Sequence, residues 1–316
     1  MSFPWAILFP GAALLGVISC QPAAEPSRTA FRLRNLPSGE HTHAYIFRDS
    51  DAKAAFAGPL DTEDPSVELP CGRTYRVHLT ANVPTAREFM SEAEYLEAGT
   101  LLEDSTPEHP SMHADTICII PGSGPSQLSM HFKRYMCKVT LEHITVRWLD
   151  SFDSPPQCSL DTVALVNVAG AAPLSGAPSA MGRWFNKGCI DGEFPQGVRE
   201  LIINDNGFPV DSSGTVPVGV SLYAMPNPSD GNGYGLPWTE RKTRLAVKLT
   251  VDGTPNWFPV DLPPMEGNCW YTVSNLVING PGTPGPDQEP NRSGMQFRLV
   301  VLPWEDYNLN LEFQNR

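Results

Sequence analysis

Residues 270–313 read WYTVSNLVINGPGTPGPDQEPNRSGMQFRLVVLPWEDYNLNLEF. The stretch contains three short runs rich in β-branched and aromatic residues, at 270–278, 295–302 and 307–313, separated by clusters of Gly, Pro, Asn and Asp. Such runs between turn-forming clusters are typical of strands in all-β sandwiches. The last run alternates strictly between apolar and polar residues, which predicts a strand with one apolar face.

The same pattern extends upstream through most of the chain. Apolar and polar residues alternate over 31–34, 75–79 and 139–146, and the largely apolar run 163–168 is typical of a strand buried on both faces. Helical periodicity is scarce, and its best example lies between residues 85 and 102. The sequence therefore predicts an all-β chain with one helical excursion.

The length and a turn-rich stretch predict two domains. At roughly 100–200 residues per domain, a chain of 316 residues is long enough for two. Residues 103–126 end in a Gly/Pro/Ser stretch, after which the strand pattern restarts at Gln127. We predict an N-terminal β-sandwich over 29–126 and a C-terminal β-sandwich over 127–316.

The N-terminus predicts export. Residues 6–19 read AILFPGAALLGVIS and are followed by Cys20 and a polar, Pro-rich segment, as in a secretory signal. Residues 17–20, VISC, resemble a bacterial lipobox, in which the cysteine is acylated. We predict a signal peptide at 1–19 and a lipidated leader at 20–28. A plain signal peptide and a single membrane span are alternatives, although the apolar run is shorter than the ~20 residues that a span needs.

Composition and motifs argue against several functional classes. The chain carries 35 Asp and Glu against 22 Lys and Arg, a formal charge of −13, whereas nucleic-acid binding depends on basic residues that neutralise phosphates. Nucleophile-elbow, phosphate-binding-loop and zinc-protease motifs are absent from the sequence, so we predict no enzyme and no cofactor.

Candidate ligand residues do not add up to a metal site. His41 and His43 would share one face of a strand, but they lack a third ligand with fitting spacing. Pro110 lies between His109 and His113 and would break a helix, so we place both of these histidines in a loop. The Asp- and Asn-rich segments 49–51 and 204–207 lack the spaced acidic ligands of a calcium loop and are predicted to be hairpin turns.

Six cysteines follow Cys20. In an exported chain they could form three disulfides or remain buried thiols, and the sequence leaves both alternatives open. They are Cys71, Cys118, Cys137, Cys158, Cys189 and Cys269.

A series of motifs in a fixed order carries a family resemblance. In chain order they are RYMCKVTL (134–141), AMPNP (224–228), TRLAVKL (243–249), WFPVDLP (257–263), NCWYTV (268–273), LVINGPGT (276–283) and MQFRLVVLPW (295–304). Each is weak alone, but their order resembles that of the Bacteroidales fimbrillin superfamily, the subunits of type V pili. Met225 and Gly267 stand where the family usually has an aromatic residue and an Arg.

The resemblance implies a fold, a location and a set of partners. It implies two tandem transthyretin-like β-sandwich domains, export as a lipoprotein, and anchoring in the outer membrane through a lipid on Cys20. The expected partners are other pilus subunits, together with a host or bacterial surface ligand, and the expected function is that of a structural subunit of a fimbrium that contributes to adhesion. Stalk subunits of the family are cut by a trypsin-like protease, which opens a groove for a strand of another subunit.

The sequence offers candidate parts for such strand exchange. The tail suits a donor strand because four apolar residues alternate along it: Tyr307, Leu309, Leu311 and Phe313. The alternative is that the tail is the terminal strand of its own second domain. A cut after Arg28 would remove only the leader, whereas a cut after Arg34 would also remove the strand 31–34. If these arginines merely line a solvent face, the protein is an uncleaved anchor or tip subunit.

Aromatic residues in the second half keep one other functional class open. Trp238, Trp257, Trp270 and Trp304 could form a stacking platform for sugars, which would make the protein a surface glycan-binding lipoprotein. We predict instead that the run 270–278 is core, with Trp270, Val273, Leu276 and Ile278 mostly buried.

Overall fold

The computed structural model describes residues 28–34, 41–61, 66–84, 88–120, 126–187, 202–210, 214–233, 238–291, 293–304 and 307–315. For 28–34, 126–129, 202–208 and 307–315 the description concerns the backbone. The predicted signal peptide, Cys20 and Cys189 lie outside the described residues. No helix among the described residues is long and apolar enough to cross a membrane.

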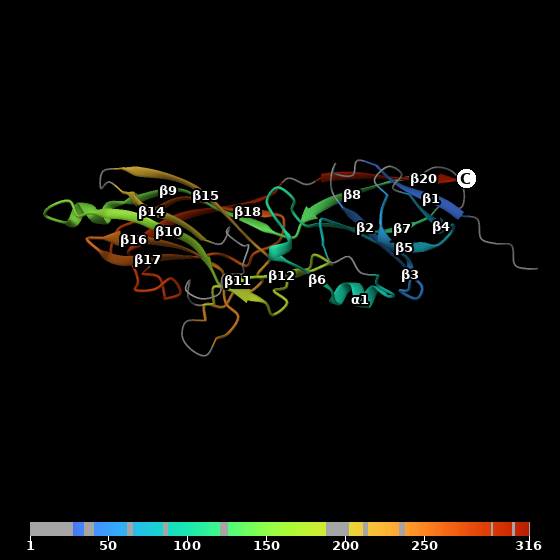
Figure 1. Cartoon of the computed structure of the whole chain (residues 1–316), viewed down its shortest axis with the longest axis horizontal. Coiled ribbons are helices and arrows are strands. Elements are labelled where there is room, and N and C mark those ends of the chain that lie inside the picture. Colours follow the sequence, from blue (N-terminus) through green and yellow to red (C-terminus); the bar gives the residue numbers. More distant parts are fainter. Residues whose placement is uncertain are drawn as a thin grey trace, which may run out of the picture.

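The molecule is elongated and built almost wholly of strands, which confirms the predicted all-β class (Figure 1). One half contains an eight-stranded sheet, and the other contains two four-stranded sheets. The eight-stranded sheet has the order β3 (Ala54–Pro59), β2 (Thr42–Arg48), β5 (Thr74–Ala81), β7 (Met112–Ile119), β8 (Ser126–Arg134), β20 (Tyr307–Asn315), β1 (Arg28–Arg34), β4 (Ser66–Pro70).

The two four-stranded sheets face each other in the second half. The orders are β15 (Thr215–Ala224), β9 (Cys137–Val146), β18 (Cys269–Ile278), β19 (Met295–Pro303), and β14 (Ile202–Pro209), β10 (Cys158–Val166), β16 (Arg244–Val251), β17 (Thr254–Asp261). Two small ladders complete the described set, namely β11 (Val168–Ala169) with β13 (Trp184–Phe185), and β12 (Ala171–Pro173) with β6 (Gly99–Leu101).

Period-two alternation, reset in β18 by a bulge between Val273 and Asn275, builds the core between the four-stranded sheets. Val273, Leu276 and Ile278 of β18 are fully buried there, as predicted. Trp270 is only half-buried, because it lies on the opposite face of β18, beside polar Thr140 of β9. The prediction that most of this run is core is confirmed, and Trp270 is its exception.

A second core lies under the eight-stranded sheet. Tyr75, Val77 and Leu79 of β5 are fully buried in it, while the intervening Arg76 is exposed. The alternation read from the sequence therefore predicts the core face of this strand correctly, although His78 on the other face is buried as well. Met130 and Phe132 of β8 are buried in the same cluster.

The helical excursion is shorter than the pattern 85–102 predicted. Helix α1 (Glu92–Glu97) begins after Ser91, whose side chain caps the backbone N–H of Glu94, and two 3₁₀ turns occur at Leu102–Asp104 and Arg147–Ser151. Helix α1 buries Glu92 and Tyr95, and the Tyr95 ring lies within 5.5 Å of the rings of Tyr45 and Phe89. Tertiary packing of these side chains thus stabilises this short helix.

Two local predictions have different outcomes. Residues 49–51 form the turn between β2 and β3, as predicted. Residues 204–207 lie inside β14 rather than in a hairpin turn, so that prediction is wrong. The register between β14 and β10 shifts near Leu160, and this bulge accommodates the Asn- and Gly-rich segment within a ladder.

The sheets change between β8 and β9, at residues 135–136, several residues after the predicted boundary at 126. The division into two domains at that boundary stays a prediction.

Candidate assembly site

The C-terminal tail is a strand in the middle of the eight-stranded sheet. β20 pairs antiparallel with β8 on one side and with β1 on the other (Figure 1), in a different sheet from β19, which precedes it in the chain. The alternative that the tail is the terminal strand of its own second domain is therefore wrong, and its role as a donor strand stays a prediction. The tail crosses to the other half of the molecule and completes the sheet there.

The register shows which positions of β20 share a face. Leu311 stands opposite Leu128 of β8 and Leu33 of β1, and Leu309 stands opposite Met130. Directly opposed residues lie on one face of a sheet. Since Met130 is only 2% exposed, the register places Leu309 and the alternate positions Tyr307, Leu311 and Phe313 on the core face of the sheet.

The two candidate processing residues are the ends of β1. Arg28 is the first residue of this strand and Arg34 is the last, and β1 is held between β20 and the short edge strand β4. Cleavage after Arg34 would cut the chain where β1 ends. Loss of β1 would leave main-chain donors and acceptors unpaired on β20 and β4, the kind of exposed edge that folded proteins avoid. Cleavage itself and lipidation of Cys20 stay predictions.

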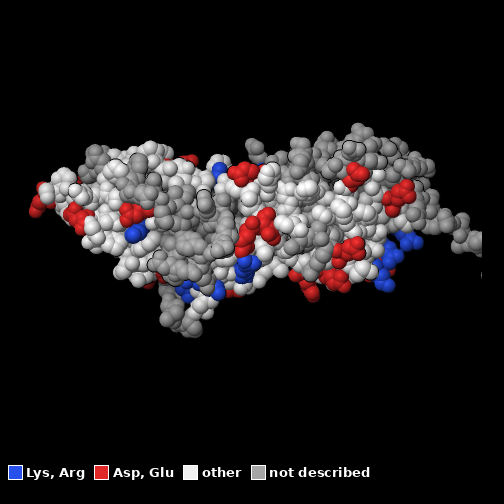
Figure 2. Space-filling model, in the orientation of Figure 1, with Lys and Arg blue, Asp and Glu red and all other residues white. Residues whose placement is uncertain are grey.

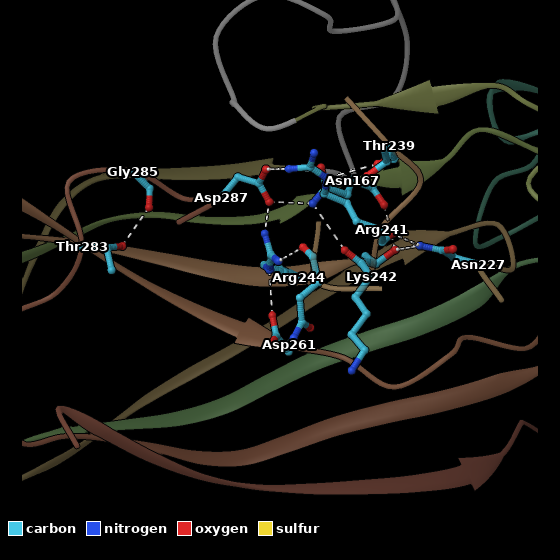
Figure 3. Close-up of polar contacts among 12 residues, drawn as sticks. Asn167, Asn227, Thr239, Arg241, Lys242, Arg244, Asp261, Thr283, Gly285 and Asp287 are labelled. Carbon is cyan, nitrogen blue, oxygen red and sulfur yellow. Dashed lines mark hydrogen bonds and ion pairs between the residues drawn. The ribbon is translucent and has the colours of Figure 1, made fainter. Parts of the chain in front are cut away.

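A buried ion-pair network lies where β16 begins and β17 ends, in the second half (Figure 3). The Asp287 carboxylate accepts hydrogen bonds from Arg241 Nη1 at 2.8 Å, from Asn167 Nδ2 at 2.7 Å, and from Arg244 Nη1. Arg244 also donates to Asp261 Oδ1 at 2.7 Å. The Arg244 side chain is fully buried, and those of Arg241 and Asp287 are 4% and 6% exposed.

This network fixes the loop that connects β18 to β19. Asp287 lies in that loop, and Thr283 of the same loop exchanges backbone hydrogen bonds of 2.9 and 2.8 Å with Trp257 of β17. Two guanidinium groups and two carboxylates balance each other in charge, so the cluster provides structural anchoring. Local sequence patterns could not predict this network, because its members are up to 120 residues apart.

The structure places two of the candidate histidines, His41 and His113, differently from the sequence prediction. His41 precedes β2 and lines a 420 Å³ cavity together with His109 and Asp104. Among the described residues, no group of three His, Cys, Asp or Glu side chains could hold a metal ion.

His113 lies on β7, not in a loop as predicted. Its ring stacks on Tyr135 at a centroid distance of 4.8 Å, and burial lowers the pKa of His113 to about 4.

Trp257 and Trp270 do not form together the stacking platform that a glycan-binding protein would need. Trp257 lies on β17 and Trp270 on β18, which belong to different sheets. Trp238 packs edge-on against the buried Trp184 at 5.9 Å. Cys118, Cys137, Cys158 and Cys269 are free thiols in the described part of the chain.

Comparison with known proteins identifies the fold. Neither a family model nor a curated protein matches the sequence. A putative cell adhesion protein from Bacteroides eggerthii has a similar structure, with a TM-score of 0.57, 15% identity, and coverage of 84% of this chain and 89% of that one. One from Parabacteroides distasonis has a TM-score of 0.57 and 11% identity, with coverage of 89% and 100%.

A fimbrilin from Porphyromonas gingivalis is similar over most of its length as well. Its TM-score is 0.54 at 15% identity, and the match covers 87% of this chain and 97% of the fimbrilin. At these identities the likeness concerns the fold, and it agrees with the order of the sequence motifs. This all-β chain therefore has a fimbrillin-like fold, the fold of the Porphyromonas fimbrilin and of the Bacteroides and Parabacteroides adhesion proteins.

Proposed function

We propose that the protein is a structural subunit of a type V pilus, exported as a lipoprotein to the outer membrane, displayed on the cell surface and contributing to adhesion. The fimbrillin-like fold supports this proposal, and so does the order of the sequence motifs. The observation that carries it is the position of β20, a C-terminal strand that completes a sheet in the opposite half of the molecule.

Strand exchange follows from that position. The backbone bonds that β20 makes with β8 can be made equally well by β20 of a second copy, because exchanging an identical element keeps the same contacts. Removal of β1 would free one side of β20 and lower the barrier to its departure. The alternating residues would set the register, since a slip of one position would move Asn308, Asn310 and Glu312 to the core face.

Cleavage and assembly can be tested on the purified chain. An Arg-specific protease should convert the protein into a ladder of oligomers that resists SDS, and deletion of residues 305–316 should abolish the ladder. A double variant, Arg32→Gln with Arg34→Gln, is the matched control, because it should still be cut after Arg28 but should keep β1 and stay monomeric. A cut wild-type chain that remains monomeric at high concentration would contradict a stalk role and leave an anchor or tip subunit.

The lipid anchor can be tested in cells. A Cys20→Ala variant should lose labelling with a fatty-acid probe and appear in soluble fractions, because the acylated thiol is missing. Unchanged membrane retention and labelling of this variant would contradict the lipoprotein proposal.

A further inference from the structure

A row of aromatic and cationic side chains crosses the outer face of the sheet β15-β9-β18-β19. The register aligns Tyr223, Lys138, Trp270 and Leu302, one residue from each strand. Their neighbours Val139 and Tyr271 are buried in the core, so the row itself lies on the opposite face. Leu302 is 52% exposed, and the other three are half-buried.

Cations lie directly on the aromatic rings of this row and its neighbours. Lys138 Nζ is 4.2 Å from the centre of the Trp270 ring, and Trp270 Nε1 donates to Thr140 Oγ1 at 2.8 Å. Trp304 stacks on Tyr223 at 5.9 Å, and the Arg134 guanidinium lies 4.4 Å above Trp304. We call Arg134, Lys138, Tyr223, Trp270, Leu302 and Trp304 the aromatic–cationic patch.

The patch has the chemistry of a protein-binding surface. Tyr, Trp and Arg are the residues that dominate binding energy in interfaces. Neither this row nor the next one, Ser221, Thr140, Thr272 and Val300, contains a carboxylate, although the chain has 35 acidic residues. Burial alone lowers the pKa of Lys138, and no carboxylate among the described residues contributes to it. The complementary partner is therefore an acidic protein surface.

The position of the patch indicates which acidic surface this is. Trp304 is three peptide steps before Tyr307, the first residue of β20, so their Cα atoms are at most about 11 Å apart. Whichever sheet receives β20 must therefore lie beside the patch. The half of the molecule that contains the receiving sheet is acidic, with 14 Asp and Glu against 5 Lys and Arg over residues 41–120.

We propose that the aromatic–cationic patch is the docking surface for a second copy of this chain, the copy whose sheet receives β20. This inference rests on the proposed strand exchange and adds a rigid contact at the root of the exchanged strand. The patch attracts the acidic half of the incoming copy and holds it while the strand enters. Opposite charges of this kind act mainly on the rate of association and weaken with salt.

The first test is kinetic. At about 20 mM salt, Lys138→Glu should slow ladder growth of the protease-cut chain at least tenfold and remove most of its salt dependence. Lys248→Glu is the matched control, because Lys248 also lies near a tryptophan, Trp257 at 6.0 Å, but on the other sheet and with Asp161 as its partner at 3.7 Å. Equal rates for the Lys138→Glu variant, the control and wild type would overturn the proposal.

The second test does not depend on ladder formation. A photo-crosslinker, p-benzoylphenylalanine, replaces Leu302 in one copy, and the second copy is labelled with ¹⁵N so that intermolecular products are recognised by mass. Crosslinks to residues 41–120 of the labelled copy are expected, and they should disappear at 1 M salt. Crosslinks that are absent or fall within residues 137–303 of the labelled copy would overturn the docking surface, even if the ladder itself forms. Absence of the ladder together with the expected crosslinks would instead contradict strand exchange.

Discussion

Replacing Asp287 by Ala should strongly destabilise the second half of the molecule. The Asp287 carboxylate is 6% exposed and accepts hydrogen bonds from two buried guanidinium groups and one buried amide. Its removal takes away the carboxylate that Arg241 and Arg244 share, so both buried guanidinium groups lose an ion-pair partner. Removing one member of a buried ion pair costs about 3–5 kcal/mol.

The measurement is urea unfolding followed by tryptophan fluorescence, with the free energy of unfolding compared between variants. Asp51→Asn is the matched control, because Asp51 pairs with Arg48 at 3.1 Å while both side chains are at least one-third exposed. That surface pair should contribute at most about 1 kcal/mol. A loss below 1 kcal/mol for Asp287→Ala would refute the view that this network anchors the loop between β18 and β19.

Three further predictions concern the rest of the fold. Burial lowers the pKa of His113 from 6.5 to about 4, so the unfolded chain takes up this proton before the folded chain as the pH falls. The free energy of unfolding should therefore decrease by up to about 3 kcal/mol between pH 6.5 and pH 4. His113→Phe should flatten that part of the profile of urea midpoint against pH. Gly176→Ala should cost more than Gly182→Ala in the same assay, because both glycines have φ of +71° but a Cβ at 176 would lie 2.0 Å from the His113 ring, whereas the site at 182 is open; equal losses would contradict this packing. Leu276→Ala should lower the free energy of unfolding by about 2–5 kcal/mol in thermal or urea melts, whereas Leu302→Ala, at 52% exposure, should change it by at most about 0.5 kcal/mol.

Local pattern in the sequence predicted much of the fold. Alternation placed Val77 and Leu79 in one core, because strands bury every second residue, and the apolar run 270–278 placed Val273 and Ile278 in the other. The order of short motifs predicted a fimbrillin-like fold. The same signals failed at residues 204–207, where a ladder with a bulge took up Asn and Gly that usually mark turns.

The pairing partners of the strands could not be predicted in the same way. The alternation of Tyr307–Phe313 shows that the tail is a strand, but it does not show that β8 and β1 flank it, because that choice depends on contacts about 180 and 280 residues away in sequence. The Asp287 network and the row from Tyr223 to Leu302 are hidden for the same reason. Each is assembled from several strands, and no single segment contains its pattern.

The exchange of β20 is the central claim, and a disulfide between β20 and β8 tests it most directly. Leu128 and Leu311 stand opposite each other in the register, so cysteines at both positions should bond and hold the tail in its own sheet. A Leu128→Cys, Glu312→Cys pair is the control, because Glu312 is opposite Gln127 and faces the other way. After the Arg-specific cut, the oxidised Leu128→Cys, Leu311→Cys chain should remain monomeric and should form the ladder once a reductant is added. A ladder that grows at the wild-type rate while mass spectrometry shows this disulfide intact would contradict the account.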